Sequence, residues 1–160
     1  MQWGVYGIHL GIVLMVLGIA FSGPYSSERE AILSEGKKVS ISGYEFVYTG
    51  LENQKTPGVN IFQANLEVLK DGRKLGELHP QKRLYRNHNQ PFAEVSVLPS
   101  LGNELYSTLL GFTEDKVASV KISVNPLVNW IWLGGTITCI LGFLGFDLRR
   151  KAKPGRQTDI

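Results

Sequence analysis

Hydrophobic residues gather in two long runs, one near each end of the chain. The runs cover Val5–Phe21 and Leu127–Phe146, and neither contains Asp, Glu, Lys or Arg. A helix of about 20 residues is roughly 30 Å long, which matches the hydrocarbon thickness of a bilayer. Pro126 suits the first turn of the second helix, and Trp130 and Trp132 suit the aromatic belt at a membrane interface. The pattern therefore predicts two membrane-spanning helices.

Between the two runs, polar and apolar residues alternate as they do in β-strands. Strands are predicted at residues 44–49, 59–69, 74–78, 95–98 and 117–124. Asp71-Gly72 is a strong signal for a two-residue hairpin turn between the second and third of these strands. Residues 101–110 fit either a short helix or another strand. We predict an exported all-β domain, a sandwich or small barrel, flanked by two transmembrane helices.

These elements divide the chain into four parts. They are a first transmembrane helix at 1–23, an extracytoplasmic β domain at 24–124, a second transmembrane helix at 125–147 and a basic tail at 148–160. Residues 28–121 hold 12 basic and 12 acidic side chains, so the net charge of +3 resides at the C-terminal end. A neutral domain between two apolar runs excludes a freely soluble protein and gives no sign of nucleic-acid binding.

Charge also sets the expected orientation in the membrane. Five basic residues follow the second apolar run: Arg149, Arg150, Lys151, Lys153 and Arg156. By the positive-inside rule we expect both termini in the cytoplasm and residues 24–124 in the periplasm of an inner-membrane protein. The alternative is a cleaved signal peptide with Ala20-Phe21-Ser22 as its cleavage site, which would leave a secreted binding protein with one C-terminal anchor.

Small residues and one imidazole occupy opposite faces of the first predicted helix. At about 100° per residue, one stripe collects four glycines: Gly4, Gly7, Gly11 and Gly18. Small residues let a second helix approach closely, so this face is expected to pack on another helix. His9 lies nearly opposite, where an imidazole surrounded by hydrocarbon needs partners. Protein is therefore expected on both sides, in a bundle larger than two helices.

Three roles for His9 are compatible with its chemistry. Neutral imidazole is a good axial ligand of haem iron, it hydrogen-bonds to neighbouring helices, and it serves in proton relays and ion sites. A haem would need a second ligand from elsewhere, because His79 and His88 belong to the outer domain. Those two histidines lack Cys or carboxylate ligands at zinc spacing, and Cys139 is expected to be a small packed residue of the second span.

Four stretches carry a further signal. They are Ile8-His9-Leu10-Gly11 with the apolar run up to Phe21-Ser22, then Ser42-Gly43-Tyr44-Glu45-Phe46, then Leu78-His79-Pro80-Gln81-Lys82-Arg83-Leu84-Tyr85 with Glu94, and Asn125-Pro126-Leu127-Val128-Asn129-Trp130-Ile131-Trp132-Leu133-Gly134-Gly135. In this order they resemble the C-terminal part of the CcmF/NrfE family of haem lyases of bacterial cytochrome c maturation. Family members are long, many-spanning proteins, so the chain is similar to the C-terminal piece of a split form.

The resemblance implies a role for His9. In the family, the matching histidine is one of two axial ligands of a haem b held within the membrane, and the other ligand comes from a span that this chain lacks. Two-histidine ligation suits electron transfer. The implied partners are a larger multi-spanning haem lyase subunit, the haem chaperone and apocytochrome c, besides membrane lipid. Catalysis is not expected of this chain by itself, because the residues that contact the haem being attached belong to the partner.

Two further expectations concern the outer domain. Lys82 and Arg83 are candidate contacts for haem propionates or a partner, because both side chains pair well with carboxylates. Alternatively, Pro80 ends a strand and the charges that follow are solvated. A rival function belongs to a different class: a haem-free membrane assembly subunit, in which His9 only hydrogen-bonds between helices and the β domain is a docking module.

Overall fold

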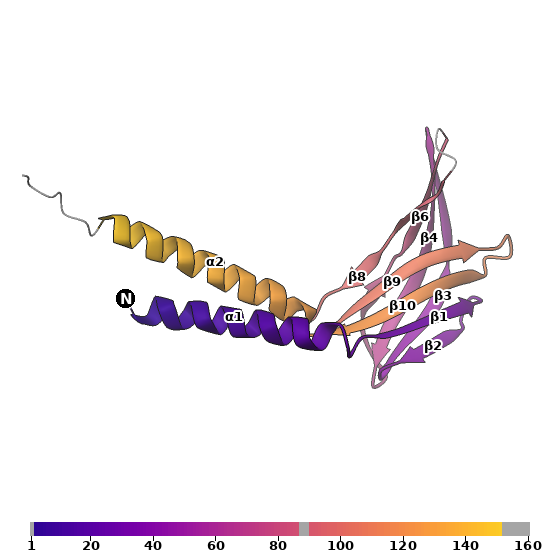
Figure 1. Cartoon of the computed structure of the whole chain (residues 1–160). Coiled ribbons are helices and arrows are strands. Elements are labelled where there is room, and N and C mark those ends of the chain that lie inside the picture. The colour runs from indigo at the N-terminus through magenta and orange to yellow at the C-terminus, as the bar shows by residue number, and fades with distance from the viewer. Residues whose placement is uncertain (1, 87–89, 152–160) are drawn as a thin grey trace, which may run out of the picture.

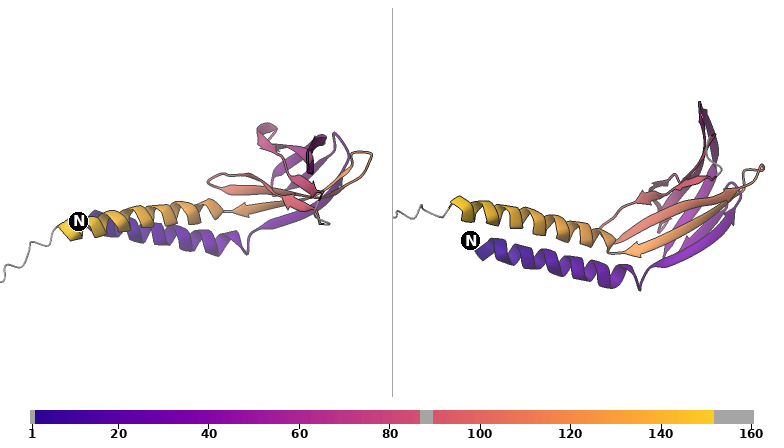
Figure 2. Two further views of the ribbon diagram at one scale, coloured as in Figure 1. Left: turned by 90° about the horizontal axis from the view of Figure 1, so that it is seen from above. Right: turned by 45° about the horizontal axis from the view of Figure 1, so that its top comes forward.

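The computed structural model describes residues 2–86 and 90–151, and it places the side chains of 4–86 and 90–145. Two helices, α1 (Gln2–Ser22) and α2 (Val128–Lys151), lie side by side and extend from one end of a β domain (Figures 1 and 2). The strands are β1 (Ser27–Leu33), β2 (Lys38–Ile41), β3 (Tyr44–Thr56), β4 (Val59–Lys70), β5 (Arg73–Leu78), β6 (Gln81–Tyr85), β7 (Phe92–Glu94), β8 (Ser96–Leu98), β9 (Asn103–Phe112) and β10 (Ala118–Pro126).

In the described part of the chain, the strands form two antiparallel sheets that pack as a sandwich. The first sheet has the order β1-β10-β9-β8, and the second has the order β2-β3-β4-β6-β7 with β5 also beside β4. β5 pairs with Leu66–Lys70 of β4, and β6 pairs with Val59–Gln63 of the same strand. The two short strands therefore share one edge of β4, with His79 and Pro80 between them.

The core lies between the sheets because each long strand alternates buried and accessible side chains. Its buried hydrophobic residues are Leu33, Val39, Tyr44, Phe46, Tyr48, Ala64, Leu66, Val68, Leu78, Leu105, Leu109, Ala118, Val120, Ile122 and Val124. The hydroxyl of Tyr48 donates to the carbonyl of Lys116 at 2.8 Å, which satisfies the one polar atom of that ring. Burial and the nearby Glu35 carboxylate raise the pKa of the Tyr48 phenol.

The first sheet sets the position of both helices. β1 follows α1, β10 leads into α2, and the two strands pair directly, with Ser27 opposite Val124. The two chain segments therefore leave the sheet side by side, and the helices continue as an antiparallel pair (Figure 1). Leu127, at the junction of β10 and α2, has a positive φ of 57°. This turn joins strand to helix within a single residue.

Glycines let the helices approach closely, as the glycine stripe predicts. A side chain at Gly11 would collide with Thr138 and with the Gly134 backbone, and one at Gly7 would collide with Leu141. A Cβ at Gly18 would lie 2.6 Å from a side-chain carbon of Ile131. Gly4 has open space around it, so three of the four predicted glycines form the contact. The helix that covers this face is α2 of the same chain.

The two helices and the sandwich confirm the predicted fold class. Asp71 and Gly72 both have positive φ, 51° and 74°, as a two-residue hairpin turn of the predicted kind requires. Residues 103–112 form β9, so the helix alternative for 101–110 is wrong. Strands β1, β2, β6 and β7 were not predicted. Pro80 does follow the end of a strand, but Gln81–Tyr85 is itself a strand and not a solvated turn.

Candidate functional site

His9 lies in the middle third of α1 with its ring exposed on the side away from α2. Gly7 and Gly11, on either side of it in sequence, contact α2, whereas the face around His9 is apolar and open. The exposed side chains on that face include Tyr6 and four aliphatic residues: Val5, Ile12, Val13 and Val16. Among the described residues, no side chain of this chain covers the imidazole. That a second protein element lies against this face stays a prediction.

One ring nitrogen of His9 is engaged within its own helix. Nδ1 lies 2.7 Å from the carbonyl oxygen of Val5, one turn earlier. A carbonyl oxygen can only accept a hydrogen bond, so Nδ1 carries the proton. In the neutral ring the lone pair then resides on Nε2, which has no hydrogen-bond partner among the described residues. This tautomer presents a metal-ligating nitrogen to whatever packs on the open face.

Lys82 and Arg83 lie on opposite faces of β6, because successive residues of a strand alternate. Nζ of Lys82 donates to the carbonyl of Leu110 in the other sheet, so this side chain ties the two sheets together. Arg83 pairs with the Glu94 carboxylate at 2.5 Å and is 35% exposed. The two cations therefore do not form a joint basic surface, and Arg83 is the one at the domain surface.

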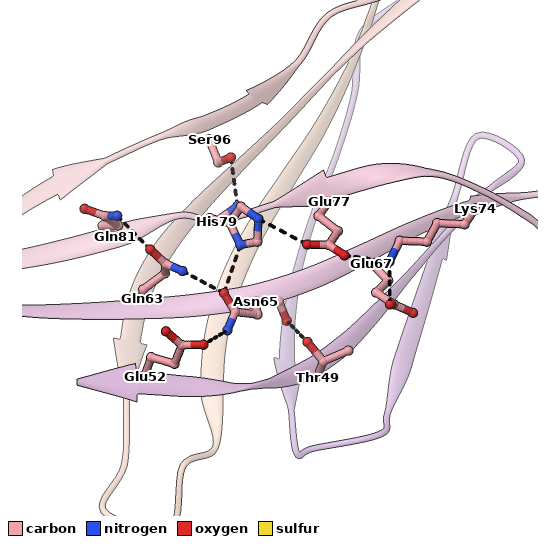
Figure 3. A network of polar contacts seen from close by, with 10 residues as sticks. All are labelled: Thr49, Glu52, Gln63, Asn65, Glu67, Lys74, Glu77, His79, Gln81 and Ser96. Carbon is pink, nitrogen blue, oxygen red and sulfur yellow. Dashed lines mark hydrogen bonds and ion pairs between the residues drawn. The ribbon is translucent and has the colours of Figure 1, made fainter. Parts of the chain in front are cut away.

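His79 belongs to a polar network on the outer face of the second sheet (Figure 3). Its Nδ1 lies 2.9 Å from Oδ1 of Asn65, and its Nε2 lies 3.3 Å from Oε2 of Glu77. The Asn65 amide nitrogen donates to Glu52 at 2.8 Å, which fixes the direction of that amide. Both ring nitrogens of His79 thus face acceptors, and its backbone N–H donates to Ser96 Oγ at 2.8 Å.

Lys74 completes this network at its other end. Its Nζ contacts Glu67 at 2.8 Å and Glu77 at 2.5 Å. The hydrogen bond and charge of Lys74 lower the pKa of the Glu77 carboxyl, and His79 adds to this effect. The hydrogen bonds to Glu67 and Glu77 raise the pKa of Lys74. Lys74 thus pairs with two carboxylates, while the Glu52 carboxylate accepts from the Asn65 amide, which is the arrangement of a structural surface network.

The described residues contain no cluster of three or more His, Cys, Asp or Glu side chains that could hold a metal ion. Within the described ranges, His79 lies beside only one carboxylate, that of Glu77. His88 lies outside the described residues. Cys139 is exposed on α2 and is a free thiol, although the sequence predicts a packed residue at this position.

Both helices are long and apolar enough to cross a membrane, over Gly4–Ser22 and Val128–Gly145. Comparison with known proteins adds the decisive observation, because the family described as "CcmF C-terminal beta-sandwich" matches residues 24–126. The chain belongs to the CcmF family. This confirms the resemblance found in the sequence, and the matched range is the β domain between the two helices. CcmF membership and the two apolar helices together indicate a membrane protein.

Individual CcmF-family relatives match nearly the whole chain. "Cytochrome c-type biogenesis protein CcmF" of Pseudomonas aeruginosa is 32% identical over 152 residues, which is 94% of this chain and 23% of the relative. The Escherichia coli protein of the same name is 30% identical over 156 residues, or 97% of this chain and 24% of the relative. "Cytochrome c-type biogenesis protein NrfE" of Haemophilus influenzae is 26% identical over 151 residues.

A solved CcmF structure has the same fold. "Cytochrome c Heme Lyase CcmF" superposes with a TM-score of 0.73 at 23% sequence identity, covering 88% of this chain and 23% of that chain. The chain spans about a quarter of the length of the relatives it matches. It corresponds to the C-terminal part of CcmF-family proteins.

Two features of the site are not readable from the sequence. The first is the contact of His9 with the Val5 carbonyl, which fixes the tautomer. The four-residue spacing of Val5 and His9 permits this contact, but the rotamer of the His9 side chain decides whether it forms. The second is the network around His79, because Asn65, Glu77 and Ser96 come together only through the pairing of β4 with β5 and the packing of β8.

Proposed function

We propose that this chain is the C-terminal part of a cytochrome c haem lyase complex and contributes His9 as an axial ligand to a haem b in the membrane. The geometry of His9 carries the proposal. Its Nδ1–H donates to the Val5 carbonyl, which leaves the Nε2 lone pair available on an exposed side chain. Metal-bound histidines usually donate their other N–H to a carbonyl or carboxylate in this way. The imidazole therefore fits one axial position of a haem.

A haem with two histidine ligands supplies electron transfer, because it keeps no open position for a substrate. The described residues of α1 and α2 contain one histidine, His9. This chain can therefore provide one of the two ligands from its membrane segments. The second ligand comes from a larger multi-spanning subunit in this proposal. The relatives are about four times as long as this chain, so a CcmF-family protein has further length in which the second ligand can lie.

We place the chain in the inner membrane, with both termini in the cytoplasm and residues 24–124 in the periplasm. The pairing of β1 with β10 supports this topology, because it makes both helices leave the same end of the domain. Two antiparallel helices from one end put the two termini on the same side of a membrane. The basic residues that follow α2 assign that side to the cytoplasm.

The β domain serves as a docking module for the larger subunit, the haem chaperone or apocytochrome c in this proposal. Arg83 is the candidate for contact with a haem propionate or a partner carboxylate, because it lies at the surface and already pairs with one carboxylate, Glu94. Lys82 is the weaker candidate, because its ammonium group bonds across the sandwich to Leu110.

The test is an absorption spectrum of the complex of this chain with its multi-spanning partner. We compare wild type with His9→Gly and with Leu10→Ala, a matched change at an exposed neighbour on α1. We expect the bands of bis-histidine haem b to disappear in His9→Gly, to return when free imidazole is added, and to persist in Leu10→Ala. Imidazole rescue separates loss of the ligand from loss of the complex.

Unchanged haem b bands in a His9→Gly complex that purifies intact would contradict the ligand role. The haem-free assembly subunit would then be the better description, with His9 bonded to the Val5 carbonyl and contacting a neighbouring helix. A pull-down of the partner by each variant, run on the same preparations, shows whether the complex has formed.

A further inference from the structure

We propose that the loop between β8 and β9, residues 99–102, lies in the lipid interface and that Leu101 inserts its side chain among the headgroups and upper acyl chains. The proposal rests on the proposed function in one respect, namely that α2 crosses a membrane. It goes further because it assigns a membrane contact to the β domain itself. Three observations support it: the attachment of the loop to α2, its depth and its chemistry.

Consecutive carbonyls of the loop accept hydrogen bonds from the start of α2. Nδ2 of Asn129 donates to the Ser100 carbonyl at 2.7 Å, and Nε1 of Trp130 donates to the Leu101 carbonyl at 2.8 Å. The backbone N–H of Leu127 donates to the Gly102 carbonyl, also at 2.7 Å. The loop is therefore fastened along its length to the first turn of the helix.

The loop is also braced from within. The backbone N–H of Asn103 donates to Ser100 Oγ at 3.1 Å, and Asn103 pairs with Pro126 at the end of β10. The ends of the loop thus cannot move far from the strand that leads into α2.

These contacts set the depth of the loop in the membrane. The apolar span of α2 begins at Val128, and Trp130 lies two residues, or roughly 3 Å, further along the axis. The bonded carbonyls of Ser100 and Leu101 are at the level of that first turn. A loop at this level meets the headgroup region and the upper acyl chains. It is the depth at which tryptophan is enriched, with its ring in the apolar layer and its N–H near polar groups.

The side chains of the loop suit this depth. Leu101 is 70% exposed, and the sequence Pro99-Ser100-Leu101-Gly102 has no charged residue. Other aromatic side chains gather at the same end of the helices. Trp132 is 70% exposed on α2, and the rings of Phe21 and Tyr25 stack 5.4 Å apart at the end of α1. The lipid interface is thus the occupant that covers Leu101.

The experiment measures the depth of labelled sites in the full chain, reconstituted in vesicles of phosphatidylcholine and phosphatidylglycerol. An environment-sensitive fluorophore is attached in turn to the native Cys139, to Leu101→Cys with Cys139→Ala, and to Ile32→Cys with Cys139→Ala. Ile32 is the matched control. It is 78% exposed on β1, five residues or roughly 17 Å of strand beyond Ser27, which pairs beside the helices. Quenching is recorded with lipids that carry a nitroxide at a shallow or a deep position.

We expect the label at position 101 to emit at shorter wavelength than the label at position 32 and to lose more intensity to shallow than to deep nitroxides. The label at position 139 should lose most to deep nitroxides, and the label at position 32 should lose little to either. The substitution at 101 keeps the loop attached because its hydrogen bonds use main-chain carbonyls. An unchanged far-UV circular dichroism spectrum checks this.

Each other outcome overturns a distinct claim. A label at 101 that behaves like the one at 32, while the label at 139 is quenched, overturns the loop proposal and leaves the membrane-spanning α2 intact. If the label at 139 also escapes quenching, the membrane placement and the proposed function both fail. If the emission of the label at 101 shifts to shorter wavelength only when the multi-spanning partner is added, a protein surface covers Leu101. The proposed lipid contact is then wrong.

Discussion

Gly11 and Gly134 face each other where α1 and α2 pack, and neither position has room for a side chain. A Cβ on Gly11 would lie 2.7 Å from the Gly134 carbonyl oxygen, and a Cβ on Gly134 would lie 2.9 Å from the Met15 backbone nitrogen. Backbone atoms cannot give way as the end of a flexible side chain can. The contact between Gly11 and Gly134 therefore holds together two helices that come from opposite ends of the sequence.

We predict that Gly11→Leu separates the helices and destabilises their packing by about 1–3 kcal/mol, since overpacking of a close contact costs this much. Gly142→Leu on α2 is the matched control, because a side chain there meets open space. The measurement is unfolding in mixed micelles followed by far-UV circular dichroism. Equal midpoints for the two variants would show that the glycine contact does not hold the helix pair together.

The sandwich core predicts a second contrast in stability. Leu66 is 1% exposed between the sheets, so Leu66→Ala should lower the free energy of unfolding by about 2–5 kcal/mol. Ile32 is 78% exposed, so Ile32→Ala should change it by less than about 0.5 kcal/mol. Both changes in the free energy of unfolding are measured by urea unfolding of the full chain in detergent, followed through the circular dichroism signal of the β-strands. A small effect of Leu66→Ala would mean that Leu66 does not lie in the core.

The network around Lys74 predicts a pH dependence with a definite sign. The pKa of Glu77 lies below its ordinary value of 4.5 in the folded chain, mainly because of the Lys74 hydrogen bond. The stability that Glu77 contributes is therefore present above pH 4.5 and is lost as the pH falls through the lowered pKa. For Lys74, whose pKa is raised above 10.5, the contribution is present below that value and is lost as the pH rises through the raised pKa.

We expect Lys74→Gln to move the pKa of Glu77 up toward its ordinary value and to flatten the acid limb of the stability curve. Nuclear magnetic resonance titration of the Glu77 carboxyl measures the first effect. Glu114→Gln is a control, because no ion pair of Glu114 occurs among the described residues. An unchanged Glu77 titration in Lys74→Gln would contradict the cause assigned to the lowered pKa.

The ion pair of Arg83 with Glu94 allows the propionate contact to be tested. If Arg83 binds a carboxylate of haem or of a partner, Arg83→Gln should reduce the yield of matured cytochrome c. Glu94→Gln should keep or raise that yield, because it removes the competing carboxylate at 2.5 Å. Covalent haem staining of the cytochrome in cells that express each variant with the partner measures the yield. An equal loss in both variants would instead indicate that the pair acts as a structural unit.

The strongly patterned elements could be predicted from the sequence, and the polar ones could not. The apolar runs and the alternation of β3, β4 and β10 indicate buried surface directly. β1, by contrast, contains Glu28, Arg29 and Glu30, and it is a strand because β10 pairs with it. β6 is short and begins with three polar residues, and it pairs with the edge of β4, while β7 has three residues and pairs with β6. Pairing between distant segments leaves little trace in a local pattern.

The features of the candidate site also divide into those that the sequence predicts and those that it does not. The opposite placement of the glycine stripe and His9 follows from helical periodicity, and α2 does cover the glycine side. Which ring nitrogen carries the proton depends on the rotamer that brings Nδ1 to the Val5 carbonyl. The attachment of Leu101 to Trp130 joins residues 29 positions apart through one carbonyl and one indole, neither of which is distinctive in sequence.

The pairing of β1 with β10 also has a consequence for biosynthesis. Among the described strands β1 leaves the ribosome first, yet its hydrogen-bonding neighbour β10 (Ala118–Pro126) leaves last. The β1 edge stays uncovered until β10 has been translated, and the glycine side of the first span stays uncovered until α2 has followed. Such late closure is slow and invites association with other chains. Export and insertion machinery that shields α1 and β1 would thus act on this protein until β10 and α2 have emerged.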